Sequence, residues 1–220
     1  MPTTPPGTTW TIIVAAGSAS RFGGSTPKQF LEIAGKRVVD WSVVAASSVS
    51  DGVVVVVPAG SSVKVSAHGL GCEVLSVPGG LTRSESVRNG LAAVPADTAV
   101  VLVHDAARPV ASAELFAQVV AAVTAGADAV VPITPVVDTI RTVDGEIVDR
   151  AQLQAVQTPQ GFAAGALRHA HATAGEATDD ATLVKAVGGT VAVVQGDRWN
   201  IKVTEPDDAL VVGALLEQRP

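Results

Sequence analysis

The chain has 220 residues, of which 47% are hydrophobic, and a formal net charge of −6. This length fits one large domain with a substantial core. The acidic total argues against a nucleic-acid-binding protein, which needs a broad basic face, and no apolar run approaches the roughly 20 residues of a membrane helix. The single cysteine, Cys72, rules out an internal disulfide and favours a reducing cytoplasm.

In chain order, residues 1–8 are expected to form a disordered lead-in, because they lack the basic start and apolar core of a signal peptide. One domain is expected over 9–220. Val-rich runs predict strands at 11–16, 52–57, 72–77, 99–105, 129–134 and 190–196. Helical patterns lie between and after them, at 38–49, 83–94, 112–125, 163–174 and 204–218.

The fold class follows from the character of these runs. They are mostly continuous rather than alternating, which is typical of strands that are buried on both faces. Strands that alternate with helices indicate an α/β fold. We therefore expect a single-domain, Rossmann-like architecture, with a mostly parallel sheet and helices on both of its faces.

The segment 134–160 breaks the pattern, because it has no helical period. Asp144-Gly145 lies there between short β-prone runs, and Asp-Gly in such a setting favours a hairpin. We expect a β-hairpin arm at about 136–157 that projects from the sheet. The alternative is an ordinary surface loop, although ordered loops of this length are uncommon unless they are functional.

The first strand is followed by the glycine-rich stretch AAGSASRFGGSTPKQF, which carries Arg21 and Lys28. Small residues allow a ligand to approach the backbone closely, and exposed amides can hold phosphate. An arginine fork and a lysine point charge suit phosphate oxygens. The stretch is neither a Walker A loop nor a dinucleotide fingerprint, since it lacks GK[ST] and the GxGxxG spacing.

Two further motifs follow predicted strands, where ligands of open α/β sheets collect. In VPGGLTRSESVRNGL, a glycine turn precedes a helix that Ser84 or Ser86 could cap or line, and the alternative is a plain turn. In VHDAARP, Asp105 could bind a ribose or a magnesium ion, while a simple salt bridge with Arg108 is the alternative. We interpret His104 as a core or supporting histidine.

Two more candidates come late in the chain. WNIKVTEPDD supplies Lys202 after the last strand. TDDATLV carries Asp179 and Asp180, for which helix capping and ligand binding are equally consistent with the pattern.

Taken together and in order, these motifs resemble those of 2-C-methyl-D-erythritol 4-phosphate cytidylyltransferases, from about residue 10 to the C-terminus. The carriers are AAGSASRFGGSTPKQF, GG with RSESV, VHDAARP, DTI, DR, QTPQ, TDDA and NIKVT. HDAARP and NIKVT are the most specific. The stretch AAGSASRFG alone is similar only to GT-A-type nucleotidyltransferases in general.

The resemblance implies transfer of a cytidylyl group from CTP to a polyol phosphate, 2-C-methyl-D-erythritol 4-phosphate, with release of pyrophosphate. It implies that Ala15, Ala16 and Gly17 line the path of the cytidine and the phosphates. It also implies that Gly80 and Ser86 hold the cytosine.

For the chemistry, the resemblance implies that Arg21, Lys28 and Lys202 are catalytic and face the transferring phosphate. Asp105 is expected near the ribose and as a ligand of Mg²⁺ or another divalent cation. Phosphoryl-type transfer depends mainly on positioning and charge stabilisation, which agrees with a set of cations and no Ser-His pair.

For the acceptor, the resemblance implies that Arg108, Thr139 and Arg150 bind the methylerythritol phosphate. In the family the arm crosses to a second subunit, so a cytoplasmic homodimer is expected whose arms contribute Thr139 and Arg150 to the partner's site. Membranes and nucleic acids are not expected as partners.

Three alternatives stay open at this point. A ribitol-5-phosphate cytidylyltransferase would share most of the motifs and differ in its acceptor. A GT-A glycosyltransferase would carry an Asp-x-Asp metal motif that VHDAARP does not provide. An inactive nucleotide-binding module would be free to lose Arg21, Lys28 and Lys202, all of which are present.

Overall fold

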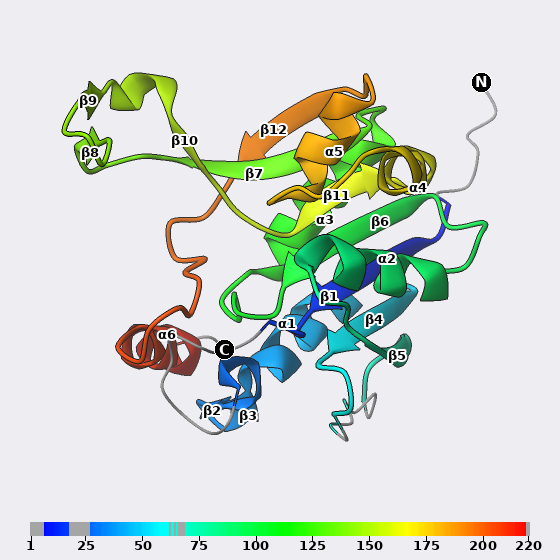
Figure 1. Cartoon of the computed structure of the whole chain (residues 1–220). Coiled ribbons are helices and arrows are strands. Elements are labelled where there is room, and N and C mark those ends of the chain that lie inside the picture. Colours follow the sequence, from blue (N-terminus) through cyan, green and yellow to red (C-terminus); the bar gives the residue numbers. More distant parts are fainter. Residues whose placement is uncertain (1–6, 18–26, 62, 64, 66–68, 219–220) are drawn as a thin grey trace.

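The structure is a computed structural model that describes residues 7–17, 27–61, 63, 65 and 69–218 (Figure 1). Its strands are β1 (Thr9–Val14), β2 (Glu32–Ile33), β3 (Lys36–Arg37), β4 (Gly52–Val57), β5 (Glu73–Pro78), β6 (Val100–Asp105), β7 (Ala129–Pro135), β8 (Ile140–Arg141), β9 (Ile147–Val148), β10 (Gln154–Val156), β11 (Gln160–Ala163) and β12 (Val191–Gln195). Its helices are η1 (Lys28–Phe30), α1 (Val38–Ser47), α2 (Arg83–Ala93), α3 (Ala113–Thr124), η2 (Arg150–Gln152), α4 (Ala164–Thr173), α5 (Asp180–Ala186) and α6 (Asp208–Glu217).

An eight-stranded sheet organises the chain, in the order β10-β7-β11-β6-β1-β4-β5, with β12 paired to β7. The pairs β1–β4, β1–β6, β4–β5 and β7–β12 are parallel. The α/β fold with a mostly parallel sheet and flanking helices is therefore confirmed. In the parallel region Val14 lies beside Asp105, so β1 and β6 end together at one edge of the sheet.

The continuous apolar strands are explained by burial on both sides of the sheet. In β1, Ile12 packs into one core cluster with residues of α2, α4 and α5, while Ile13 packs into a second cluster with residues of α1 and α3. Neither side chain is exposed. Helices cover both faces of the sheet, as Figure 1 shows, so the side chains on both faces of a central strand are mostly apolar.

One central strand was not predicted from the sequence. Strand β11 lies between β6 and β7 and is antiparallel to both. It is short, and its Gly161 has no room for a side chain, because a Cβ there would lie 2.5 Å from Val119 Cγ1 of α3. A four-residue strand that contains glycine has too weak a pattern to be recognised in a sequence.

The predicted hairpin arm is present and projects from the sheet (Figure 1). Strands β8 and β9 pair in antiparallel fashion, with Asp144-Gly145 in their connection and a left-handed Gly145 at φ 99°. The projecting part is shorter than the expected 136–157, because Gln154–Val156 already pair with β7 as β10. The arm therefore spans about residues 136–153.

A smaller third cluster joins the C-terminal helix to the body. Val212 and Leu216 of α6 pack with Ile33, Val38 and Val203. Ordered strand structure begins at Thr9, while most of the expected lead-in lies outside the described residues. None of the helices that the structure describes is both long and apolar enough to cross a membrane.

Candidate active site

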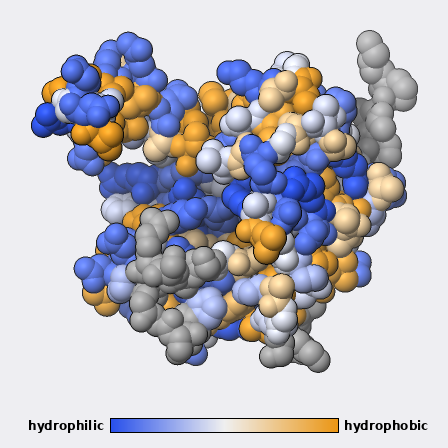
Figure 2. Space-filling view, viewed as in Figure 1, coloured by the Kyte–Doolittle hydropathy of each residue, from blue (hydrophilic) through white to orange (hydrophobic). Residues whose placement is uncertain are grey.

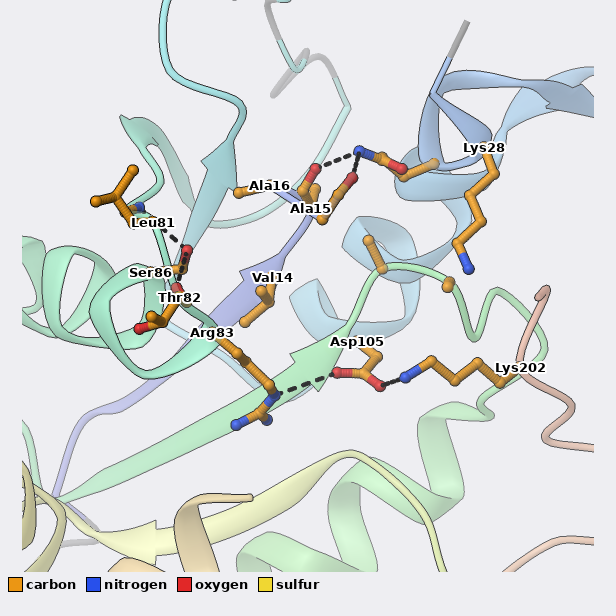
Figure 3. A pocket seen from close by; sticks show the side chains of 15 residues that line it. Val14, Ala15, Ala16, Lys28, Leu81, Thr82, Arg83, Ser86, Asp105 and Lys202 are labelled. Atoms are coloured by element: carbon orange, nitrogen blue, oxygen red, sulfur yellow. Dashed lines mark hydrogen bonds and ion pairs between the residues drawn. The ribbon is translucent and has the colours of Figure 1, made fainter. Parts of the chain in front are cut away.

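A cavity of about 550 Å³ opens beyond the carboxyl ends of β1, β5 and β6 (Figure 3). This is the place where ligands bind in open α/β sheets. Among the residues that the sequence singled out, its lining includes Ala15, Ala16, Gly17, Lys28, Gly80, Ser86, Asp105 and Lys202. These side chains come from loops far apart in the sequence, and the parallel strands bring the loops to one edge of the sheet.

The backbone after β1 is held in place by a residue that the sequence did not single out. Gln29 of η1 is only 3% exposed, and its Nε2 donates hydrogen bonds to the carbonyl oxygens of Ala15 at 2.6 Å and Gly17 at 3.2 Å. The neighbouring Lys28 side chain points from η1 toward the cavity (Figure 3). Gln29 thus fixes the loop on one side while Lys28 supplies charge to the cavity.

The glycine turn after β5 forms the opposite wall. Gly79 approaches Ala16 so closely that a Cβ at position 79 would lie 2.3 Å from Ala16 Cβ. The Gly80 amide donates to Ser86 Oγ at 3.1 Å, and Ser86 Oγ donates to the Thr82 carbonyl at 2.9 Å. Ser86 lines the cavity and fixes the turn at the same time.

Helix α2 is capped by Thr82, so of the two roles left open for Ser84 and Ser86 the structure shows lining, by Ser86, and not capping. Thr82 Oγ1 accepts from the Glu85 amide at 3.0 Å, and Glu85 Oε2 accepts from the Leu81 amide at 2.6 Å. This is a capping box whose acidic residue reaches back one residue further than usual. The two bonds hold the turn rigidly against the start of the helix.

Asp105 lies between two cations at the end of β6. Its Oδ2 is 2.7 Å from Lys202 Nζ, and its Oδ1 is 3.9 Å from Arg83 Nε (Figure 3). Burial alone would raise the pKa of Asp105, but the charges of Lys202, Arg83 and Arg108 outweigh burial and place that pKa below its usual value. Asp105 is therefore a carboxylate at neutral pH.

The simple Asp105–Arg108 salt bridge that the sequence left open is absent from the described contacts. Arg108 Nη1 instead donates to the carbonyl oxygen of Asn200 at 2.7 Å, and Arg108 Nε is buried without a hydrogen-bond partner among the described residues. Burial lowers the pKa of Arg108, and the negative charge of Asp105 partly offsets that effect. Arg108 Nη2 makes a long hydrogen bond of 3.5 Å with the Val156 carbonyl oxygen, so this exposed end of the guanidinium has donor capacity left for a ligand.

A second pocket of about 370 Å³ adjoins the first. Its lining includes Arg108 together with Gln160 and Asp179. Asp179 is the N-cap of α5, since its Oδ1 accepts from the Thr182 amide at 2.8 Å, and its Oδ2 accepts from Gln160. Asp179 thus caps α5, as one interpretation of TDDATLV expected, and it also lines a pocket.

His104 supports Asp105 from inside the core, as the sequence interpretation held. It is fully buried, with Nδ1 3.1 Å from Thr158 Oγ1 and Nε2 3.3 Å from the Arg108 carbonyl oxygen. Thr158 Oγ1 also accepts from the Asp105 amide at 3.0 Å. One neutral tautomer satisfies the set: His104 Nε2 donates to the carbonyl, and Nδ1 accepts the Thr158 hydroxyl proton.

Comparison with known proteins decides the family. The family model for 2-C-methyl-D-erythritol 4-phosphate cytidylyltransferase matches residues 9–218. The chain belongs to this family. A cytidylyltransferase of that name from Nocardia farcinica is 43% identical over 216 residues, which cover 94% of each chain. The crystal structure of the Thermus thermophilus cytidylyltransferase superimposes with a TM-score of 0.80 and 37% identity, and covers 94% of this chain and 98% of that one.

Some relatives of this cytidylyltransferase family are longer. A protein from Dinoroseobacter shibae, named bifunctional enzyme IspD/IspF, is 45% identical over 219 residues. The match covers 94% of this chain but only 54% of that relative. The chain thus spans about half the length of the bifunctional relatives and nearly all of the N. farcinica protein.

Two of the described residues that the cytidylyltransferase resemblance suggested, Thr139 and Arg150, do not line the two pockets. Arg21 lies outside the residues that the structure describes. Thr139 and Arg150 are exposed on the arm, and Arg150 Nη1 donates to the carbonyl oxygen of Val137. Within one chain, these two arm residues stand apart from the cavity that contains Lys28 and Lys202.

The side chains around Asp105 can be compared with the ligands that the expected divalent cation prefers. Within the described part of the chain, no group of three His, Cys, Asp or Glu side chains gathers to hold an ion. Mg²⁺, however, commonly binds through one or two carboxylates plus substrate phosphates. Asp105 is one such carboxylate, and its Oδ1 has only the long 3.9 Å contact with Arg83. The residues therefore fit a magnesium ion that a triphosphate would bring with it.

Sequence reasoning missed Arg83, whose side chain lines both pockets. The available signal was its place as the first residue of α2, directly after a glycine turn and a capping threonine. Burial alone would lower the pKa of Arg83, but the carboxylates of Asp180 and Asp105 outweigh burial and raise that pKa. Arg83 is thus a fixed positive charge at the junction of the two pockets.

Proposed function

We propose that this chain transfers the cytidylyl group of CTP to 2-C-methyl-D-erythritol 4-phosphate. The observation that carries the proposal is a shared wall: Arg83, Asp105 and Lys202 line both adjoining pockets. Two anionic substrates, one in each pocket, would meet at this wall. Family membership supports the identity of both substrates.

The reaction would need no covalent nucleophile. An oxygen of the acceptor phosphate attacks the α-phosphorus of CTP, one P–O bond forms, and the bond to the pyrophosphate leaving group breaks. The acceptor is already an anion at neutral pH, so the enzyme's task is to bring two anions together. Lys28 and Lys202, together with Arg21 as the resemblance implies, would balance the charge that grows during transfer.

We infer that CTP occupies the larger cavity, with its base at the Gly80–Ser86 turn and its phosphates along Ala15–Gly17. The lining supports this placement, because Ala15–Gly17 and the Gly80–Ser86 turn face the same cavity and their small residues leave the backbone open to a ligand. Asp105 would hold Mg²⁺ together with the triphosphate. The ion would supply charge neutralisation and would polarise the phosphate oxygens.

The acceptor would occupy the second pocket, near Arg108. The weakly engaged Arg108 Nη2 supports this assignment, since Arg108 lines the pocket and a phosphate oxygen would be a stronger acceptor than the Val156 carbonyl. The family match favours methylerythritol phosphate over the ribitol-5-phosphate alternative and does not favour an inactive nucleotide-binding module.

A pyrophosphate-release assay tests the proposal directly. We expect turnover with CTP, Mg²⁺ and 2-C-methyl-D-erythritol 4-phosphate, and much slower turnover with UTP or with ribitol 5-phosphate. EDTA should abolish it, because the triphosphate charge would lose its counter-ion. Faster turnover with ribitol 5-phosphate, equal rates with UTP, or full activity in EDTA would each contradict the corresponding assignment.

We further propose a homodimer in which the arm completes the partner's site. Several large apolar side chains on the arm are exposed, among them Val137 at 76%, Val143 at 103% and Ile147 at 69%. Figure 2 shows apolar surface gathered on the arm, where it stands away from the body. A symmetric partner would give this surface something to cover, and would bring Thr139 and Arg150 to a second active site.

Mixed dimers test the shared site. Lys28→Ala and Arg150→Ala homodimers should each be nearly inactive. A mixed dimer would hold both lesions in one site and none in the other. Random mixing makes about half of the dimers mixed, and each mixed dimer has one intact site of two. Recovery of roughly a quarter of wild-type activity is therefore expected after co-expression. No recovery in verified mixed dimers would place both residues of one chain in the same site.

We also place the protein in the cytoplasm. Cys72 is a free thiol in the structure, which suits a reducing compartment, and CTP is an intracellular substrate. Recovery of the activity in the membrane or secreted fraction after cell fractionation would contradict this assignment.

A further inference from the structure

A row of alternating basic and acidic side chains runs from the core to the wall that the two pockets share. It consists of His171, Asp180, Arg83, Asp105 and Lys202, and is called the charge row below. His171 Nε2 lies 3.0 Å from Asp180 Oδ1, Asp180 Oδ2 lies 2.7 Å from Arg83 Nη1, and Arg83 Nε lies 3.9 Å from Asp105 Oδ1. Lys202 ends the row at 2.7 Å from Asp105 Oδ2.

The inner end of the charge row is not part of either substrate pocket. Asp180 is completely buried and does not line the two pockets described above, and the His171 side chain is only 2% exposed. Removing a carboxylate from water is costly unless strong partners surround it. Both oxygens of Asp180 are occupied, one by Arg83 and one by His171, so the carboxylate is rigidly held.

The guanidinium of Arg83 faces two carboxylates at once. Nη1 makes a short hydrogen bond with Asp180, while Nε faces Asp105 at a distance too long for a hydrogen bond. A planar fork can present donors in two directions, which a lysine ammonium on a flexible stem does not reproduce. Asp180 therefore determines where the Arg83 charge stands relative to Asp105.

We propose that Asp180 positions Arg83 as the counter-ion that Asp105 keeps when Lys202 turns to the substrate phosphates. The inference rests on the proposed function. Lys202 Nζ lies 2.7 Å from Asp105 Oδ2, so the ammonium that would serve the substrate phosphates is also a partner of this carboxylate. The 3.9 Å contact with Arg83 keeps a positive charge beside Asp105 as Lys202 departs, and is long enough to leave Oδ1 open to the metal ion. Arg83 and Asp180 are thus positioning residues for Lys202.

The test compares Asp180→Asn, Arg83→Lys and the double variant in the pyrophosphate-release assay. Asp180→Asn preserves shape and removes the charge, and Arg83→Lys preserves the charge and removes the fork. Each is expected to lower kcat about 10- to 100-fold, as for residues that orient a reacting group, with the KM values within a few-fold of wild type. The double variant should lose no more than Arg83→Lys alone, because the two residues act as a unit.

The matched control is Glu176→Gln. This change removes a second Arg–carboxylate pair that joins α2 to the segment before α5, because Arg88 Nη2 of α2 lies 2.8 Å from Glu176 Oε1. Neither residue lines the two described pockets. An exposed pair contributes little, so kcat should stay within about twofold of wild type. An equal loss in this control would show that tying α2 to the segment before α5 is all that matters, and would overturn the proposal.

Four further outcomes bear on the inference. Unchanged kcat in folded Asp180→Asn and Arg83→Lys overturns the inference, and so do additive losses in the double variant. If Asp180→Asn does not fold by circular dichroism, Arg83→Lys decides alone, because it keeps a charge beside Asp180. An inactive wild type would refute the proposed function and this inference with it, whereas an active wild type with unaffected variants refutes the inference only.

Discussion

The buried histidine beside the active-site carboxylate makes a strong prediction about acid sensitivity. Burial lowers the pKa of His104 from 6.5 to about 4, and the nearby charge of Asp105 only partly opposes that effect. In the unfolded chain the imidazole returns to its ordinary pKa. At a pH between these two pKa values the unfolded state binds a proton that the folded state does not bind. The folded state therefore loses stability as the pH falls below 6.5.

The magnitude follows from the two pKa values. At pH 8 neither state is protonated and the effect vanishes. At pH 5 the unfolded imidazole is almost fully protonated and the folded one is not, which costs about 2 kcal/mol of unfolding free energy from this group alone. A protonated ring would also lose its acceptor for the Thr158 hydroxyl, the group that holds the Asp105 amide.

The assay is urea unfolding of wild type and His104→Gln at pH 8 and pH 5. The His104→Gln protein should have a lower unfolding free energy than wild type at pH 8, but its glutamine side chain does not titrate. The fall in unfolding free energy from pH 8 to pH 5 should therefore be smaller in His104→Gln than in wild type by about 2 kcal/mol. His169→Gln, which replaces an exposed histidine of α4, should keep the wild-type fall. An undiminished fall in His104→Gln would refute the reasoning.

Three other predictions concern the two lysines of the cavity, the loop after β1 and the sheet. Lys28→Ala and Lys202→Ala should each lower kcat by about 10²–10³ in proteins that remain folded, since charge that grows only in the transition state appears in kcat; near-normal kcat would remove that role. Gln29→Ala should raise the KM for CTP in steady-state kinetics and leave the melting temperature nearly unchanged, because it frees the loop carbonyls after β1. A lower melting temperature with an unchanged KM would show that Gln29 serves only stability. Gly52→Ala should destabilise the protein by about 1–3 kcal/mol in urea, because its Cβ would lie 2.4 Å from the Trp10 ring; an unchanged midpoint would mean that the ring moves freely.

The sequence by itself determined the architecture and the location of the site. Continuous apolar strands require a sheet that is covered on both faces, and parallel strands end at one edge. Motifs that follow predicted strands therefore had to converge, which is why Lys28, Asp105 and Lys202 line one cavity although they lie in separate loops. The motif order also pointed to the cytidylyltransferase family that the family model matches.

The choice of ion-pair partners was decided only by the tertiary structure. Arg108 is three residues from Asp105, yet Asp105 pairs with Lys202, 97 positions away, and faces Arg83. Asp180 likewise pairs with Arg83 across 97 positions. Sequence spacing says which side chains lie on one element, but partners across elements depend on how α2, α5 and β6 pack together. The antiparallel β11 shows the same limit, because its place between β6 and β7 depends on the space beside Gly161 rather than on any pattern of its own.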